Sequence, residues 1–107
     1  MTYIRRAGEK MGFKDVRTLL VDALQSGRFQ HEHRADVSRN LLAVGEVGPE
    51  FVAQLLMRCT GRDYSCTPHH FDERVACHIF KPAYEGHRWY VKAYFLSTDA
   101  MFISVHR

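Results

Sequence analysis

Residues 88–95 (RWYVKAYF) alternate between bulky apolar side chains and side chains with a charged or polar end. The apolar positions are Trp89, Val91, Ala93 and Phe95, and the positions between them are Arg88, Tyr90, Lys92 and Tyr94. Successive side chains of a β-strand point to opposite faces of its sheet, so this period of two predicts a strand buried on one face. Such a strand needs a layer packed against its apolar face, and it leaves cations and phenols on the other face.

The first half of the chain has the spacing of amphipathic helices. Apolar residues recur at helical spacing over 14–26, 36–44 and 50–58, and the third of these segments follows Pro49, a residue favoured at a helix start. Residues 28–34 have no clear period. The sequence therefore predicts three helices before the strands begin.

The second half of the chain predicts an antiparallel meander. Besides the strand at 88–95, we expect strands over 74–81 and 101–106, with turns at 83–87 and 96–100. The segment 62–74 (RDYSCTPHHFDER) is expected to be a loop that borders the sheet. Helices followed by a meander indicate the α+β class, with N-terminal helices packed on one face of a C-terminal antiparallel sheet.

A chain of 107 residues suits a single domain, and the polar residues 1–13 are expected to form an arm before it. The sequence has no apolar run long enough to span a bilayer and no hydrophobic stretch after a basic start. We therefore expect a cytoplasmic protein whose three cysteines are reduced. The net charge of +3 permits a polyanionic partner without requiring one.

The predicted strands determine which side chains share the face away from the helices. Besides the apolar residues of 88–95, those expected to face the helices are Val75, Cys77, Ile79, Met101, Ile103 and Val105. The opposite face is then expected to carry His78, Phe80, Arg88, Tyr90, Lys92, Tyr94, Phe102, Ser104 and His106. A slip of one residue in any strand would move its whole set to the other face.

A face of this composition suits RNA. Cations neutralise phosphates, and aromatic rings stack on unpaired bases. Cleavage without metal needs a base for the 2′-hydroxyl proton, a cation for the phosphoryl oxygens and an acid for the leaving 5′-oxygen. The candidates for proton transfer are Tyr90, His78 and His106, and those for anion binding are Lys92, Arg88 and Lys81. A solvated sheet face without a function has the same composition, so both interpretations stay open.

Several short motifs occur in a recognisable order along residues 14–107. They are ALQSGRF, FVAQLLMRCTGRDYS, HIFKP, EGHRWYVKAYF and MFISVH. In this order they resemble the MqsR family of bacterial type II toxins, within the RelE-like group of endoribonucleases. That family typically has a YVK or YIK strand after a Gly-containing turn and a last strand that reads roughly ISFH. Here these segments are Tyr90-Val91-Lys92 and Ile103-Ser104-Val105-His106.

The resemblance implies an mRNA interferase, which is an endoribonuclease that cleaves messenger RNA without metal or other cofactor and halts growth. It also implies a cognate antitoxin protein, for which we expect an acidic or extended segment that adds along an edge of the sheet. The important tyrosine of the family falls on Tyr90, and its terminal basic residue falls on His106.

The chain departs from the family pattern at two places. The family has a lysine near Ser65, where Arg62 or Arg58 would have to supply the cation instead. The family has a glutamine near Cys77 and His78, and neither residue is equivalent to it. These departures leave open an altered base preference, weak activity or none.

Two other classes of protein fit parts of the sequence. One is a module of the same fold that binds RNA or a protein without cleaving it. The other is a small interaction protein held together by a metal, for which the candidate ligands are Cys59, Cys66, Cys77, His69, His70 and His78. Their spacing matches no zinc knuckle or ribbon, so we expect no metal.

Overall fold

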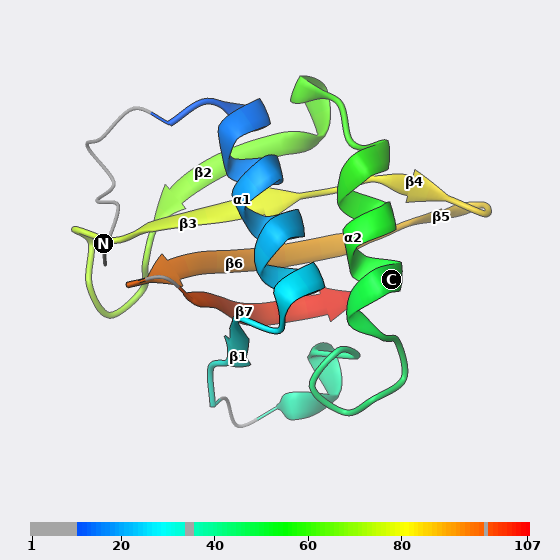
Figure 1. Ribbon diagram of the computed structural model, residues 1–107, viewed down its shortest axis with the longest axis horizontal. Helices are drawn as coiled ribbons and strands as arrows, with labels where there is room; N and C mark the ends of the chain where they lie inside the picture. The colour runs from blue at the N-terminus through cyan, green and yellow to red at the C-terminus, as the bar shows by residue number, and fades with distance from the viewer. Residues whose placement is uncertain (1–10, 34–35, 98) are drawn as a thin grey trace.

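The computed structural model describes residues 11–33, 36–97 and 99–107, so most of the predicted arm at 1–13 lies outside the described residues. Two α-helices lie side by side on one face of a five-stranded sheet (Figure 1). They are α1 (Phe13–Ser26) and α2 (Pro49–Arg58), and both agree closely with the predicted helices. The first ends at Gly27, whose positive φ of 76° is a backbone conformation that glycine adopts without strain.

The prediction of a helix over 36–44 is wrong. This segment contains only the short 3-10 turn η1 (Val37–Arg39), followed by irregular turns. Asn40 interrupts any helix because its backbone bridges to Val105 and its side-chain oxygen accepts a hydrogen bond from the Ala43 N–H at 3.1 Å. Asparagine often favours such local bonds over helix.

The sheet has the strand order β1-β7-β6-β3-β2, with β2 and β1 at its two edges (Figure 1). Its strands are β1 (Phe29–His31), β2 (Tyr64–Pro68), β3 (Ala76–Phe80), β6 (Tyr90–Leu96) and β7 (Asp99–His106). Strand β1 pairs parallel to β7 and the other pairs are antiparallel, so the sheet is mixed and not purely antiparallel as predicted. The α+β class is confirmed.

Two short strands form a separate hairpin where a turn was predicted. They are β4 (Ala83–Tyr84) and β5 (His87–Arg88), joined through Glu85 and Gly86, which both have positive φ. The segment predicted as a loop at 62–74 contains β2, which follows the 3-10 turn η2 (Gly61–Asp63). Neither β1 nor β2 was predicted.

The predicted faces are right for β6 and wrong for β3. Val91 and Ala93 belong to the buried core under the helices, which leaves Tyr90, Lys92 and Tyr94 on the other face. His78 pairs with Ala93 and Phe80 with Val91, and directly paired residues share a face. His78 and Phe80 therefore face the helices, whereas Cys77 and Ile79 point away from them.

Strand β7 contains a β-bulge, and for this reason the faces predicted for Met101 and Phe102 are wrong. Lys92 pairs with Ser104 and Ala93 with Phe102, so Ile103 is the extra residue. Phe102 and Val105 both belong to the core, although they are three residues apart. Met101, opposite Tyr94, lies on the face without helices, contrary to prediction, whereas Ser104 and His106 lie there as predicted.

We call the side of the sheet opposite α1 and α2 the helix-free face. It carries half-buried side chains from the neighbouring interior strands β6 and β7: Tyr90, Lys92, Tyr94, Met101, Ser104 and His106. The β3 side chains on this face are buried, and Cys77 has an exposed fraction of 0%. The accessible part of the face is thus the part formed by β6 and β7.

Neither of the described helices has the length and apolarity needed to cross a membrane.

Candidate functional site

Tyr90 and His106 form the centre of the candidate site. They are paired directly across β6 and β7, next to the carboxyl end of the chain. Their rings are stacked, with centroids 5.2 Å apart and an interplanar angle of 16°. The structure thus brings together the two residues that the sequence singled out most strongly, on the predicted face.

Two hydrogen bonds determine which nitrogen of His106 carries the proton. The backbone oxygen of Arg107 lies 3.1 Å from Nδ1, and Nη2 of Arg39 lies 3.3 Å from Nε2. A carbonyl oxygen only accepts and a guanidinium only donates, so Nδ1 is protonated and Nε2 presents a lone pair. In this tautomer, His106 can receive a proton at Nε2.

Arg39 is a member of the site that the sequence did not reveal. It lies in η1, 67 residues before His106 in the chain, in the segment predicted to be a helix. Asn40 fixes η1 against β7, because its Nδ2 donates to the Phe102 oxygen at 3.3 Å and the Leu41 N–H donates to the Val105 oxygen at 2.7 Å. No periodic signal could have indicated this contact.

Two lysines complete the positive surroundings of the pair. Lys81, just after β3, holds its Nζ 5.8 Å from the centroid of the Tyr90 ring. Lys92 follows Tyr90 by two residues on the same strand and face, opposite Ser104. We call Tyr90, His106, Arg39, Lys81 and Lys92 the Tyr90–His106 cluster. It combines a proton acceptor, a phenol and three cations, which can hold a phosphate and move protons around it.

Arg88 and Arg62, both predicted to bind phosphate, lie beside the cluster rather than in it. They line a shallow hollow of about 350 Å³ together with Lys81, Asp63 and two β2 residues. Arg88 donates from Nη1 to a carboxylate oxygen of Asp63 at 3.2 Å and to the backbone oxygen of Lys81 at 2.7 Å. Its guanidinium therefore fixes the turn before β2, and Arg62 is the more available cation of this hollow.

His78 is not on the helix-free face, and this corrects its predicted placement. It has an exposed fraction of 2% and faces the helices, with Nδ1 2.8 Å from the hydroxyl oxygen of Tyr64. Burial lowers the pKa of His78 to about 4, because the charged imidazolium loses its hydration there. Because His78 is buried and lies on the other face, it is no longer a candidate for proton transfer.

The cysteines do not assemble into a reactive centre. All three are free thiols. Burial raises the pKa of Cys59 to about 12, and desolvation of the sulfur raises the pKa of Cys66 although that residue is exposed as a whole. Within residues 11–33, 36–97 and 99–107, no three His, Cys, Asp or Glu side chains converge as metal ligands would. Ser65 lies on the β2 edge, where the family lysine would fall.

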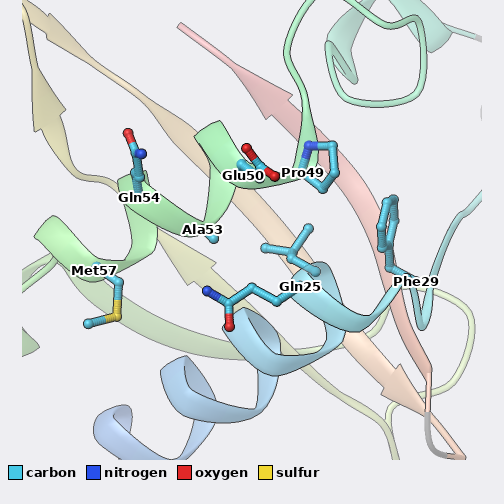
Figure 2. Close-up of a pocket in the computed structure, with 9 residues that line it drawn as sticks. Gln25, Phe29, Pro49, Glu50, Ala53, Gln54 and Met57 are labelled. Carbon is cyan, nitrogen blue, oxygen red and sulfur yellow. The ribbon is translucent and has the colours of Figure 1, made fainter.

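Another hollow lies between α1, α2 and β1 and has a volume of about 590 Å³ (Figure 2). Its labelled side chains include Gln25, Phe29, Gln54 and Met57, with Glu50 at the start of α2. This lining contains one carboxylate and no cation or imidazole. The Tyr90–His106 cluster has the better chemistry for a reaction on an anion, although its surface is flatter.

Comparison of the chain with models of protein families finds no match, and comparison with curated proteins finds none either. The candidate site therefore stands on its own geometry.

Proposed function

We propose that this chain is a metal-independent endoribonuclease that cleaves messenger RNA, similar to the MqsR toxins of the RelE-like group. The observation that carries the proposal is the stacked Tyr90–His106 pair with Arg39 bound to the imidazole and two lysines nearby. The neighbours of His106 leave Nε2 as the nitrogen that accepts a proton, which is what a general base requires. Two helices on one side of the sheet are also compatible with the α+β class that the resemblance implies.

The proposed reaction uses the ribose itself as nucleophile. Nε2 of His106 takes the proton of the 2′-hydroxyl, and the 2′-oxygen forms a bond to the adjacent phosphorus. Arg39 and Lys92 hold the phosphoryl oxygens as negative charge develops on them. The bond from phosphorus to the 5′-oxygen breaks, and the Tyr90 hydroxyl donates its proton to that oxygen. Lys81 stabilises the phenolate that remains. The products are a 2′,3′-cyclic phosphate and a 5′-hydroxyl end.

A toxin of this kind needs a partner that silences it, so we also propose an antitoxin that adds an extended segment along β2. This strand forms one edge of the sheet, and Ser65, Cys66 and Thr67 on it are exposed. The unpaired side of an edge strand offers backbone N–H and C=O groups to an incoming strand. Co-expression with the protein of a neighbouring small reading frame should restore growth and yield a complex that co-purifies.

The experiment for the proposed activity uses the full chain and single-stranded RNA in excess chelator. We expect fragments with 2′,3′-cyclic phosphate ends. Replacement of Tyr90 with Phe or of His106 with Ala should lower the cleavage rate by about 100-fold or more, because each removes a proton-transfer group. Both residues are half-buried on the surface, so circular dichroism should show an unchanged fold. The same variants should relieve growth arrest in cells.

Two results would contradict the proposal. If the RNA stays intact but still binds, the chain is instead a binding module of the same fold. If both variants cleave and arrest growth like the parent, the reaction does not occur at the Tyr90–His106 cluster.

A further inference from the structure

Phe71 is the most exposed of the large hydrophobic side chains in the described part of the chain. Its exposed fraction is 78%, whereas the next highest, that of Met57, is 58%. The residue lies in the loop between β2 and β3. A phenylalanine ring in water forgoes the free energy that it would gain by burial, so the Phe71 ring is available for contact with a partner.

The backbone beside this ring is firmly anchored. The Phe71 N–H donates to Nδ1 of His69 at 3.0 Å, and Nε2 of His69 lies 3.0 Å from a carboxylate oxygen of Glu32. His69 has an exposed fraction of 8%, and its N–H donates to the Val75 oxygen at 2.8 Å, which closes the loop. The loop is thus pinned at its base while the Phe71 ring projects from it.

The anchor connects this loop with the helix-free face. The His69 ring packs edge-on against Tyr94, with centroids 4.8 Å apart, and the Phe71 ring lies 6.1 Å from the His69 ring. Tyr94 lies four residues from Tyr90 on β6, a distance of about 13 Å at 3.3 Å per residue. Lys92 lies between the two tyrosines on the same face. Aromatic rings therefore occur at both ends of this face, with a cation between them.

We propose that Phe71 is a stacking platform for an unpaired base of the RNA strand whose phosphate lies at the Tyr90–His106 cluster. This inference rests on the proposed function and adds a second, remote contact with the substrate. The ring of His70 lies edge-on to Phe71, at 4.8 Å between centroids, and supports one side of it. The nearby Arg74 guanidinium is already paired with Asp72, and Glu73 adds a negative charge, so the contact that fits this ring is stacking of a base.

The test measures binding of RNA that cannot be cleaved because its 2′-oxygens are methylated. A strand of about twelve nucleotides is long enough to reach both ends of the face, and a dinucleotide, which has a single phosphate linkage, is not. Replacement of Phe71 with Ala should weaken binding of the long strand by about 5- to 150-fold and leave the binding of the dinucleotide unaffected. Phe71→Trp should retain affinity, and its indole fluorescence should be quenched by the long strand. Val44→Ala, which shortens another exposed apolar side chain, should change neither affinity.

If the parent binds the long strand and Phe71→Ala binds it with the same affinity, Phe71 is not a stacking platform. In that case cleavage at the Tyr90–His106 cluster would remain intact as a proposal. Unchanged RNA affinity with lost binding of a cognate protein would make Phe71 a protein contact instead. If the parent neither binds nor cleaves RNA, the proposed function and the platform fail together.

Discussion

At the scale of single residues, the contact between Arg39 and His106 decides what the imidazole can do. The guanidinium occupies the lone pair of Nε2 before any substrate is present. A phosphate next to His106 would attract the same guanidinium, since arginine binds phosphate oxygens well. In the proposed reaction, binding of RNA would thereby free Nε2 when it must act as the base.

We therefore expect Arg39→Gln to lower kcat/KM for RNA cleavage by about 100-fold, because the variant loses a cation that stabilises the transition state. The kcat/KM of Arg39→Lys should lie between the values of Arg39→Gln and the parent, since lysine keeps the charge but not the forked geometry of arginine. The measurement is the cleavage rate in chelator at limiting RNA. Arg28→Gln, which removes an exposed cation beside the end of α1, is the matched control and should cleave like the parent. Equal rates for the Arg39 and Arg28 variants would refute the role of Arg39.

His78 gives a pH prediction at the same scale. Its pKa is about 4 in the folded protein, below the value near 6.5 of an exposed histidine. Between these two values the unfolded chain binds more protons, so the free energy of unfolding should rise with pH from about 4 to 6.5 and then level off. The full change is on the order of 3 kcal/mol for this residue.

Urea titrations at several pH values would measure this dependence. His78→Gln is the suitable comparison, because glutamine can still bond to the Tyr64 hydroxyl but does not titrate. Between pH 4 and 6.5, the free energy of unfolding should rise less steeply with pH in His78→Gln than in the parent. An identical slope in both proteins would show that other groups cause the acid sensitivity.

At the scale of elements, the sequence predicts a strand's faces only where one face is polar. Strand β6 was placed correctly because Val91 and Ala93 alternate with Tyr90 and Lys92. All five residues of β3 are buried, so neither face carries a polar pattern and His78 could be assigned to either one. The bulge at Ile103 has no sequence signal of its own, which explains the error at Met101 and Phe102.

The remaining parts of the site could not be predicted, because they depend on contacts between segments far apart in the chain. The exposed β2 lacks a period of apolar residues, and β1 is three residues long. Arg39 reaches His106 only because Asn40 attaches η1 to the edge of β7. Tyr90, Lys92 and His106 were predicted because they lie on strands with a recognisable alternation.

Asn40 therefore holds an element in place, and its removal should cost stability as well as activity. Its exposed fraction is 3%, and its side chain bonds to the Phe102 oxygen and the Ala43 N–H. Asn40→Ala leaves both groups without these partners, so the free energy of unfolding should fall by about 1–3 kcal/mol. Thermal or urea unfolding measures this change. Ser38→Ala, on the exposed side of the same turn, should cost much less, and equal losses would contradict the anchoring role.

At the scale of the whole molecule, the two described helices leave the other side of the sheet uncovered by helices. Both helices pack on the same face of the sheet (Figure 1). The Tyr90–His106 cluster lies on the opposite face. The net charge of +3 is modest, so attraction of RNA depends on where the cations lie more than on their total. Arg39, Lys81 and Lys92 surround one aromatic pair, which concentrates positive charge at the proposed cleavage position.

This distribution makes the salt dependence of binding a measure of the site. Each phosphate neutralised on a single strand contributes about −0.7 to the slope of log affinity against log salt concentration. Three contacts from the cluster predict a slope of about −2 for the methylated RNA strand. Lys92→Gln should reduce its magnitude by about 0.7, because one phosphate contact is lost. Lys14→Gln removes the same charge from the exposed side of α1 and should keep the slope of the parent. If the two lysine variants have equal slopes, the RNA does not follow the helix-free face.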